Sequence, residues 1–87
     1  MLNQSLIFFI GKNGEEILAR IVEITDSSNI KGVEYYPESV RMIVHFTNGD
    51  SYSYNGIGPA AFGALIAAES VGKHFNRMKH KYTGIKV

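Results

Sequence analysis

Hydrophobic and polar residues alternate most regularly in the middle of the chain. Every even position of residues 40–46 is apolar, which is the period of a strand with one buried face. Asn48-Gly49-Asp50 predicts a tight turn, and residues 51–54 alternate again with two tyrosines on one face. The pattern therefore predicts an antiparallel hairpin over residues 40–55.

The N-terminal part of the chain predicts further strands. Residues 5–10 form an apolar run, and Asn13-Gly14 after it favours a tight turn because both residues tolerate positive φ. Residues 15–24 fit both a helical stripe and a strand-like alternation, but the turn and the β-branched residues favour a strand. After a polar break, residues 30–36 form another extended run that stops before a proline.

The C-terminal part has the character of helices. Pro59 suits a first helical turn, and the alanine-rich residues 60–70 place their larger apolar side chains on one stripe. Gly72 is expected to end this helix as a cap with positive φ. Residues 73–81 then fit a second short helix that turns its apolar side chains inward and its basic side chains outward.

These elements predict a single α+β domain over residues 1–87, since a chain of this length is enough for one core and too short for two. We expect a small antiparallel sheet of three to five strands in meander order. Two short C-terminal helices are expected to pack on one face of it. Because small domains bury a smaller fraction of their surface than large ones, pairing into a homo-oligomer would stabilise this one.

Composition narrows the setting. The chain has no cysteine, which excludes a disulfide framework and a thiolate metal site and favours the cytoplasm. The apolar run at residues 6–10 has no basic segment before it and is far too short for a membrane span, so no membrane partner is expected.

The small net charge hides an uneven distribution. Residues 1–72 carry four basic and eight acidic side chains, whereas residues 73–87 carry five basic and no acidic ones. Such a concentrated basic segment favours an anionic partner, and the alternative is a solvated helix face without a ligand.

Several segments occur together in an order that resembles a known family. They are Ser27-Ser28-Asn29-Ile30, Val33-Glu34-Tyr35, Phe46-Thr47-Asn48-Gly49, Tyr52-Ser53-Tyr54 and Ser70-Val71-Gly72-Lys73-His74-Phe75-Asn76. This order resembles the KTSC domain, a module named for its occurrence at the C-terminus of some lysyl-tRNA synthetases and also found as a stand-alone bacterial or phage protein. The resemblance covers residues 27–87 and implies a domain for which RNA binding has been suggested.

Residues 1–26 stand outside this resemblance as an N-terminal extension. Their pattern predicts a β-hairpin, which would extend the sheet or mediate self-association. No function that resides there follows from the family.

Two groups of residues are candidates for ligand contact. Tyr52 and Tyr54 would stack on unpaired bases if the sheet face is open, or pack beneath a helix if it is covered. Basic side chains of the second helix would contact phosphates, and Lys73, Arg77 and Lys81 share one face at helical spacing. The full set of expected ligand-binding residues is Tyr52, Tyr54, Lys73, His74, Asn76, Arg77, Lys79 and Lys81.

The start of the second helix is the preferred position for a bound phosphate. Backbone amides that follow Gly72 would form an anion site beside Lys73. The structural alternative is that Ser70 caps a helix and Asn76 ties the corner.

The sequence gives little support for catalysis or metal binding. His45, His74 and His80 lack the spacing of a metal site, and no G-x-S-x-G elbow or glycine-rich phosphate loop is present. We therefore expect no catalytic residues, no metal and no cofactor.

The sequence thus predicts a non-enzymatic binding module for RNA or another phosphate-bearing ligand. Two alternatives stay open: a protein-interaction module, such as a phage- or prophage-encoded modulator of a host system, and an oligomer that binds a small nucleotide.

Overall fold

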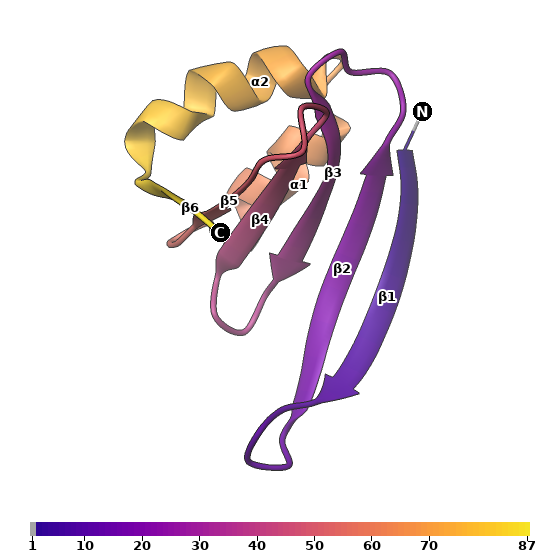
Figure 1. Ribbon diagram of the computed structural model, residues 1–87, viewed down its shortest axis with the longest axis vertical. Coiled ribbons are helices and arrows are strands. Elements are labelled where there is room, and N and C mark those ends of the chain that lie inside the picture. The colour runs from indigo at the N-terminus through magenta and orange to yellow at the C-terminus, as the bar shows by residue number, and fades with distance from the viewer. Residues whose placement is uncertain (1) are drawn as a thin grey trace.

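Six antiparallel strands follow one another in chain order across a single sheet, and each pairs with the next (Figure 1). The computed structural model describes residues 2–87. The strands are β1 (Leu2–Ile10), β2 (Glu16–Ile24), β3 (Ile30–Tyr36), β4 (Arg41–Phe46), β5 (Ser51–Tyr54) and β6 (Gly84–Lys86). The helices are α1 (Pro59–Ala67) and α2 (Val71–Met78), and a 3₁₀ turn, η1 (Lys79–Lys81), follows α2.

The predicted α+β class, meander order and strand positions are confirmed, but the expected three to five strands are too few. The ambiguous residues 15–24, apart from Glu15, lie in β2, which pairs with β1 along its whole length. The strand that the pattern missed is β6, which pairs with β5 through three residues. It has too few residues to display an alternation, so its pairing depends on β5 rather than on its own sequence.

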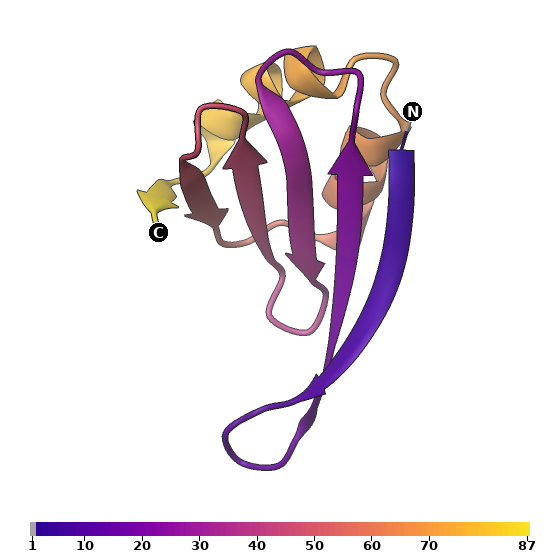
Figure 2. The same ribbon diagram turned by 45° about the vertical axis from the view of Figure 1, so that its right-hand side comes forward.

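Both helices cover the same face of the sheet, as predicted (Figure 2). Phe62 of α1 stacks on Tyr35 of β3, with ring centroids 4.2 Å apart and planes 6° from parallel. Phe75 of α2 packs edge-on against Tyr54 of β5 at 5.4 Å. The core consists of these rings and the apolar side chains of the strands between them, including Val22, Val33, Met42 and Val44.

The boundary between the helices differs from the prediction. Helix α1 ends at Ala67, and Gly72 lies inside α2 rather than in a cap with positive φ. Ser70 is the N-cap of α2, and its hydroxyl accepts a hydrogen bond from the Lys73 amide at 3.3 Å. The expected capping role of Ser70 is therefore confirmed, whereas that of Gly72 is wrong.

The second helix is also shorter than expected. Helix α2 ends at Met78, so Lys81 lies in η1 rather than on the helical face of Lys73 and Arg77. The predicted line of three basic side chains is interrupted for this reason. Phe75 and Met78 are buried, as the pattern predicts.

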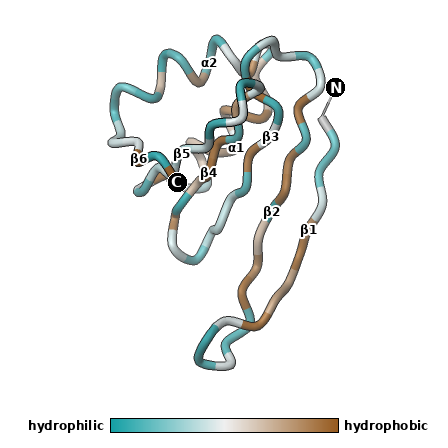
Figure 3. Tube along the Cα trace, in the orientation of Figure 1, coloured by the Kyte–Doolittle hydropathy of each residue, from teal (hydrophilic) through white to brown (hydrophobic). Residues whose placement is uncertain are grey.

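The β1–β2 hairpin projects beyond the rest of the sheet (Figures 1 and 2). Only the segment Arg20–Glu23 of β2 pairs with β3, so the turn-proximal half of the hairpin has no third strand beside it. Apolar residues continue along this half (Figure 3). Within residues 2–87, no helix is long and apolar enough to cross a membrane.

Candidate phosphate-binding site

A polar hollow of about 460 Å³ lies between the loop that joins β2 to β3 and the start of α2. The two segments are about forty residues apart in the chain. The residues that line the hollow are Asp26, Ser27, Ser28, Asn29, Ser70, Gly72, Lys73 and Asn76.

Hydrogen bonds inside the loop fix its shape. The Ser27 hydroxyl donates to the Asn29 amide oxygen at 3.0 Å and accepts from the Ile30 backbone N–H at 3.1 Å. The β4–β5 turn holds the loop from the other side, because the Thr47 hydroxyl donates to the Ser28 carbonyl at 3.0 Å. Ser27 and Asn29 therefore shape the wall of the hollow with side chains that already have partners.

Gly72 allows the helix to approach this loop. A Cβ atom at residue 72 would lie 3.0 Å from Asn29 Oδ1 and 3.1 Å from Ser27 Oγ, closer than most Cβ contacts. The glycine thus permits close packing inside a helix, which explains why it occurs there without positive φ.

Side chains at the rim of the hollow are free to bind. Within residues 2–87, the side chains of Ser28, Lys73 and Asn76 are exposed and make no hydrogen bond or ion pair with another residue. Together they offer a hydroxyl, an ammonium and an amide beside the N-terminus of a helix. Such donors suit a phosphate. The Asp26 carboxylate also lines the hollow and would repel an anion, so we expect the phosphate to lie beside Lys73.

The two tyrosines expected to contact a ligand differ in their surroundings. Tyr54 is buried, and a Cβ at Gly84 would lie only 2.6 Å from its ring, so β6 covers it. Burial, together with the nearby Tyr52 phenol, raises the pKa of Tyr54. Tyr52 is half-buried and meets Phe46 edge-on, with centroids 5.9 Å apart.

A second hollow brings both tyrosines near the end of α2. It has a volume of about 350 Å³ and is lined by Phe46, Asn48, Asp50, Tyr52, Tyr54, Phe75 and Lys79. Three of the predicted residues, Tyr52, Tyr54 and Lys79, therefore share one site. Because Tyr54 is in the core, Tyr52 and Lys79 are the members with surface to offer.

The other predicted residues are distributed around α2. Arg77 is exposed and lines, together with Lys73, Ala68, Glu69 and Ser70, a further hollow of about 560 Å³. His74 is half-buried, whereas Lys81 is exposed on η1. The structure thus places Lys73 with Asn76 in one hollow and with Arg77 in another, whereas Lys81 belongs to η1.

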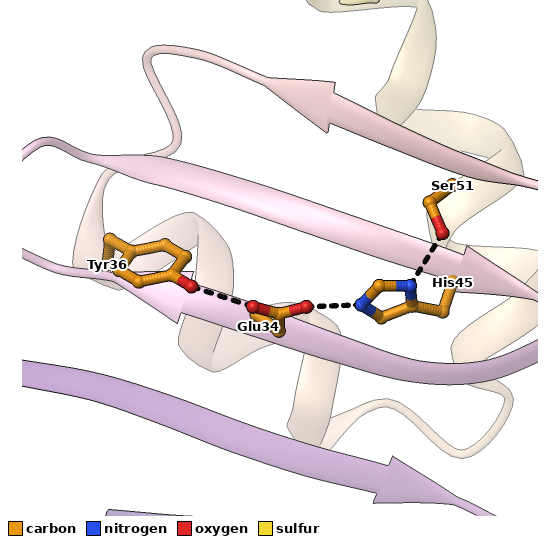
Figure 4. A network of polar contacts seen from close by, with 4 residues as sticks. All are labelled: Glu34, Tyr36, His45 and Ser51. Atoms are coloured by element: carbon orange, nitrogen blue, oxygen red, sulfur yellow. Dashed lines mark hydrogen bonds and ion pairs between the residues drawn. The ribbon is translucent and has the colours of Figure 1, made fainter. Parts of the chain in front are cut away.

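A polar network on the opposite face of the sheet was not predicted (Figure 4). The Tyr36 hydroxyl donates to Glu34 Oε1 at 2.7 Å, and the other carboxylate oxygen contacts His45 Nε2. The second ring nitrogen, Nδ1, lies 2.6 Å from Ser51 Oγ. No spacing in the sequence signals this network, because its members lie on three strands and meet only through the strand register.

The network shifts the proton affinity of two members. Burial raises the pKa of Glu34, but hydrogen bonds from Tyr36 and His45 outweigh it, so the net pKa lies below the ordinary value. Burial, the hydrogen bond to Glu34 and the charge of that carboxylate raise the pKa of Tyr36 to about 12. Both shifts keep Glu34 charged and Tyr36 protonated.

Ser51, His45 and Glu34 contact one another in the order of a nucleophile, a base and an acid. Pairing of β4 with β3 and β5 commits the backbone of these strands to the sheet. We therefore interpret the network as a tie between three strands.

Comparisons with known proteins show that the residues lining the polar hollow belong to a domain that other proteins also contain. The KTSC domain family model matches residues 26–82. An uncharacterized protein from Stutzerimonas stutzeri is 36% identical over 52 residues, which cover 60% of this chain and 73% of that protein. A protein from Tsukamurella paurometabola is 37% identical over 51 residues, covering 59% of this chain and 76% of its own length.

A solved structure extends the likeness to the whole chain. The crystal structure of a KTSC domain protein from Yersinia pestis has a TM-score of 0.68 and covers 100% of this chain and 99% of its own. Its sequence identity is 20%, so the likeness concerns the fold. The aligned region includes the β1–β2 hairpin, although the family model begins after it.

Proposed function

The chain belongs to the KTSC domain family, and from this premise we propose that it binds RNA or another phosphate-bearing ligand at the hollow beside the start of α2. One observation carries the proposal. The β2–β3 loop and the start of α2, which are far apart in the sequence, line one hollow together with the unpartnered donors of Ser28, Lys73 and Asn76. Every residue that lines the hollow lies within the part of the chain that matches the family.

The donors fit a phosphate better than an uncharged ligand. The Lys73 ammonium supplies a positive charge. Ser28 and Asn76 supply hydrogen-bond donors that have no partner within residues 2–87, so binding a phosphate would not require an existing hydrogen bond to break. No acidic residue follows Glu69 in the chain, so the field along α2 and η1 also attracts an anion.

A nucleic acid strand would use more of this surface than a free phosphate. Arg77 extends the basic surface from Lys73 along α2, and Lys79 adjoins Tyr52 at the far end of the helix. Helix α2 spans about 12 Å at 1.5 Å per residue. Two neighbouring nucleotides would therefore reach from the polar hollow toward the aromatic one, with Tyr52 available to a base.

Fluorescence anisotropy with a labelled single-stranded RNA, at two salt concentrations and beside a DNA of the same sequence, tests the proposal. We expect saturable binding that weakens with salt, and a preference for RNA if the 2′-hydroxyl is read. The variant Lys73→Ala/Asn76→Ala should raise Kd by about tenfold or more.

The matched control is Lys12→Ala, which removes an exposed lysine from the β1–β2 turn. Its affinity should equal that of the unchanged chain. Equal affinity of the Lys73→Ala/Asn76→Ala variant would remove the hollow from the proposal. Absence of any RNA binding at low salt would favour the alternatives, a protein partner or a small nucleotide held by an oligomer.

A further inference from the structure

Strand β1 is a long, exposed edge of the sheet. Its nine residues contain no charged residue and no proline, the features that usually protect an edge strand from pairing. The other edge, β6, has three residues and ends in Lys86. Within residues 2–87 no strand lies beyond β1, so its outward N–H and C=O groups are available for a further strand.

The side chains of β1 are apolar where the hairpin projects. Leu6, Ile7, Phe8, Phe9 and Ile10 are between 41% and 68% exposed. They point alternately to the two faces of the sheet, and Phe9 reaches the ring edge of Tyr36 at 6.3 Å between centroids. Five consecutive exposed apolar residues on a small protein mark an interaction surface.

The turn-proximal half of the β1–β2 hairpin lacks a third strand, so pairing of β1 with another strand would stabilise it. Residues 16–19 of β2 do not pair with β3, so the turn-proximal half of the hairpin is two-stranded. An isolated two-stranded hairpin is marginally stable in water. A strand added to β1 would make this half three-stranded and bury its exposed apolar side chains.

We propose that the added strand is β1 of a second copy of this chain, paired antiparallel about a two-fold axis. Charge supports this occupant: β1 has none, so two copies meet here without repulsion or unpaired charge. The basic residues 73–87 belong to α2, η1 and the opposite edge, so both copies keep them away from the contact. A strongly acidic partner would instead be drawn to that basic side.

The distribution of apolar residues selects one register. With the axis at Phe8, Leu6 faces the partner's Ile10 and Ile7 faces the partner's Phe9, so all five apolar residues face apolar residues. With the axis at Leu6, Phe8 and Phe9 would instead face the partner's Gln4 and Asn3. The Phe8 register therefore joins the two sheets through the apolar half of each strand.

Sedimentation velocity of the full chain across the micromolar range is the first test. The unchanged chain should form a dimer, and Phe8→Lys should raise the dimer dissociation constant by about tenfold or more because it places like charges at the axis. Ile85→Lys is the matched control, since Ile85 on β6 is 57% exposed and Phe8 is 61% exposed. This control should remain a dimer.

Disulfide trapping provides a second test that does not depend on a charged variant folding. The chain has no cysteine, so Phe8→Cys introduces one thiol. Facing residues on antiparallel strands have Cα atoms about 4.5–5.5 Å apart, within the range that a disulfide spans. We expect oxidation to link Phe8→Cys into a covalent dimer and to leave Ile85→Cys monomeric.

Three results would overturn the proposal. The first is that the unchanged chain is monomeric at all concentrations. The second is that a folded Phe8→Lys variant dimerises with the original affinity, and the third is that Phe8→Cys forms no more covalent dimer than Ile85→Cys. RNA binding by the α2 hollow does not depend on any of them, because none of residues 3–10 lines that hollow.

Discussion

Gly72 illustrates how one residue can serve two neighbouring segments. In most helices, replacing an interior glycine by alanine increases stability by about 1 kcal/mol. At residue 72 we expect no such increase, because an added methyl group would have to displace the side chains of Ser27 and Asn29. Gly63 of α1 has nothing within 4 Å of the corresponding position.

We predict that Gly63→Ala raises the free energy of unfolding by about 0.5–1 kcal/mol. Gly72→Ala should give no such gain, and should also weaken RNA binding because it moves the wall of the hollow. Urea unfolding and anisotropy on both variants measure these effects. Equal stabilisation by the two substitutions would show that the contact between α2 and the loop is looser than the structure places it.

Burial and the Glu34 carboxylate together raise the pKa of Tyr36 and keep its hydroxyl protonated. Since the folded pKa of Tyr36 is about 12 and its ordinary value is 10.0, its contribution to stability is complete below pH 10. That contribution is lost as the pH rises through about 12, because the unfolded chain releases the proton first.

Glu34→Gln should therefore lower the pKa of Tyr36 toward its ordinary value, since it removes the negative charge and leaves the ring in place. An ultraviolet titration of this variant, compared with Tyr36→Phe to identify the signal, measures the shift. An unchanged Tyr36 titration would mean that the hydroxyl does not bind Glu34 in solution.

Single residues also show where sequence reasoning reached its limit. The positions of Lys73 and Asn76 on α2 follow from local periodicity, and the structure brings them together. The Glu34 network does not follow from periodicity, because Glu34 and His45 belong to neighbouring strands whose register the alternation leaves open.

At the level of elements, the cap of α2 decides where the candidate site begins. Its Ser70 hydroxyl satisfies one of the first helical N–H groups, that of Lys73, which leaves the others for solvent or a ligand. Sequence analysis placed the end of α1 at Gly72 because glycine commonly follows a helix. Of the two capping roles expected from the sequence, that of Ser70 is therefore confirmed and that of Gly72 is wrong.

We predict that Ser70→Ala lowers the free energy of unfolding by about 1 kcal/mol, the usual value of a serine N-cap. Ser28→Ala, which changes an exposed hydroxyl in the opposite wall, should stay within about 0.5 kcal/mol of the unchanged chain. Thermal and urea unfolding compare the two variants. A Ser70→Ala variant as stable as Ser28→Ala would argue against the cap.

At the scale of the whole molecule, the sheet separates two surfaces. Both helices lie on one face of the sheet, and α2 runs from there toward β6, whereas the apolar edge lies at β1 (Figures 2 and 3). The order of five strands could be predicted because each has its own alternation or apolar run. Strand β6 could not, because three residues near the C-terminus acquire their structure from β5.

Separation of the surfaces has a consequence for binding. Pairing through β1 would leave both α2 hollows of a dimer accessible, so RNA binding and self-association should not exclude each other.

The most direct test of the proposed function is a titration of the isotopically labelled chain with a short single-stranded RNA, followed by amide nuclear magnetic resonance. We predict that the largest shifts fall on Ser28, Asn29, Gly72 and Lys73, with smaller ones near Tyr52 and Lys79, and that added salt reverses them. Shifts confined to other regions, or an unchanged spectrum at low salt, would contradict a phosphate-binding site at the start of α2.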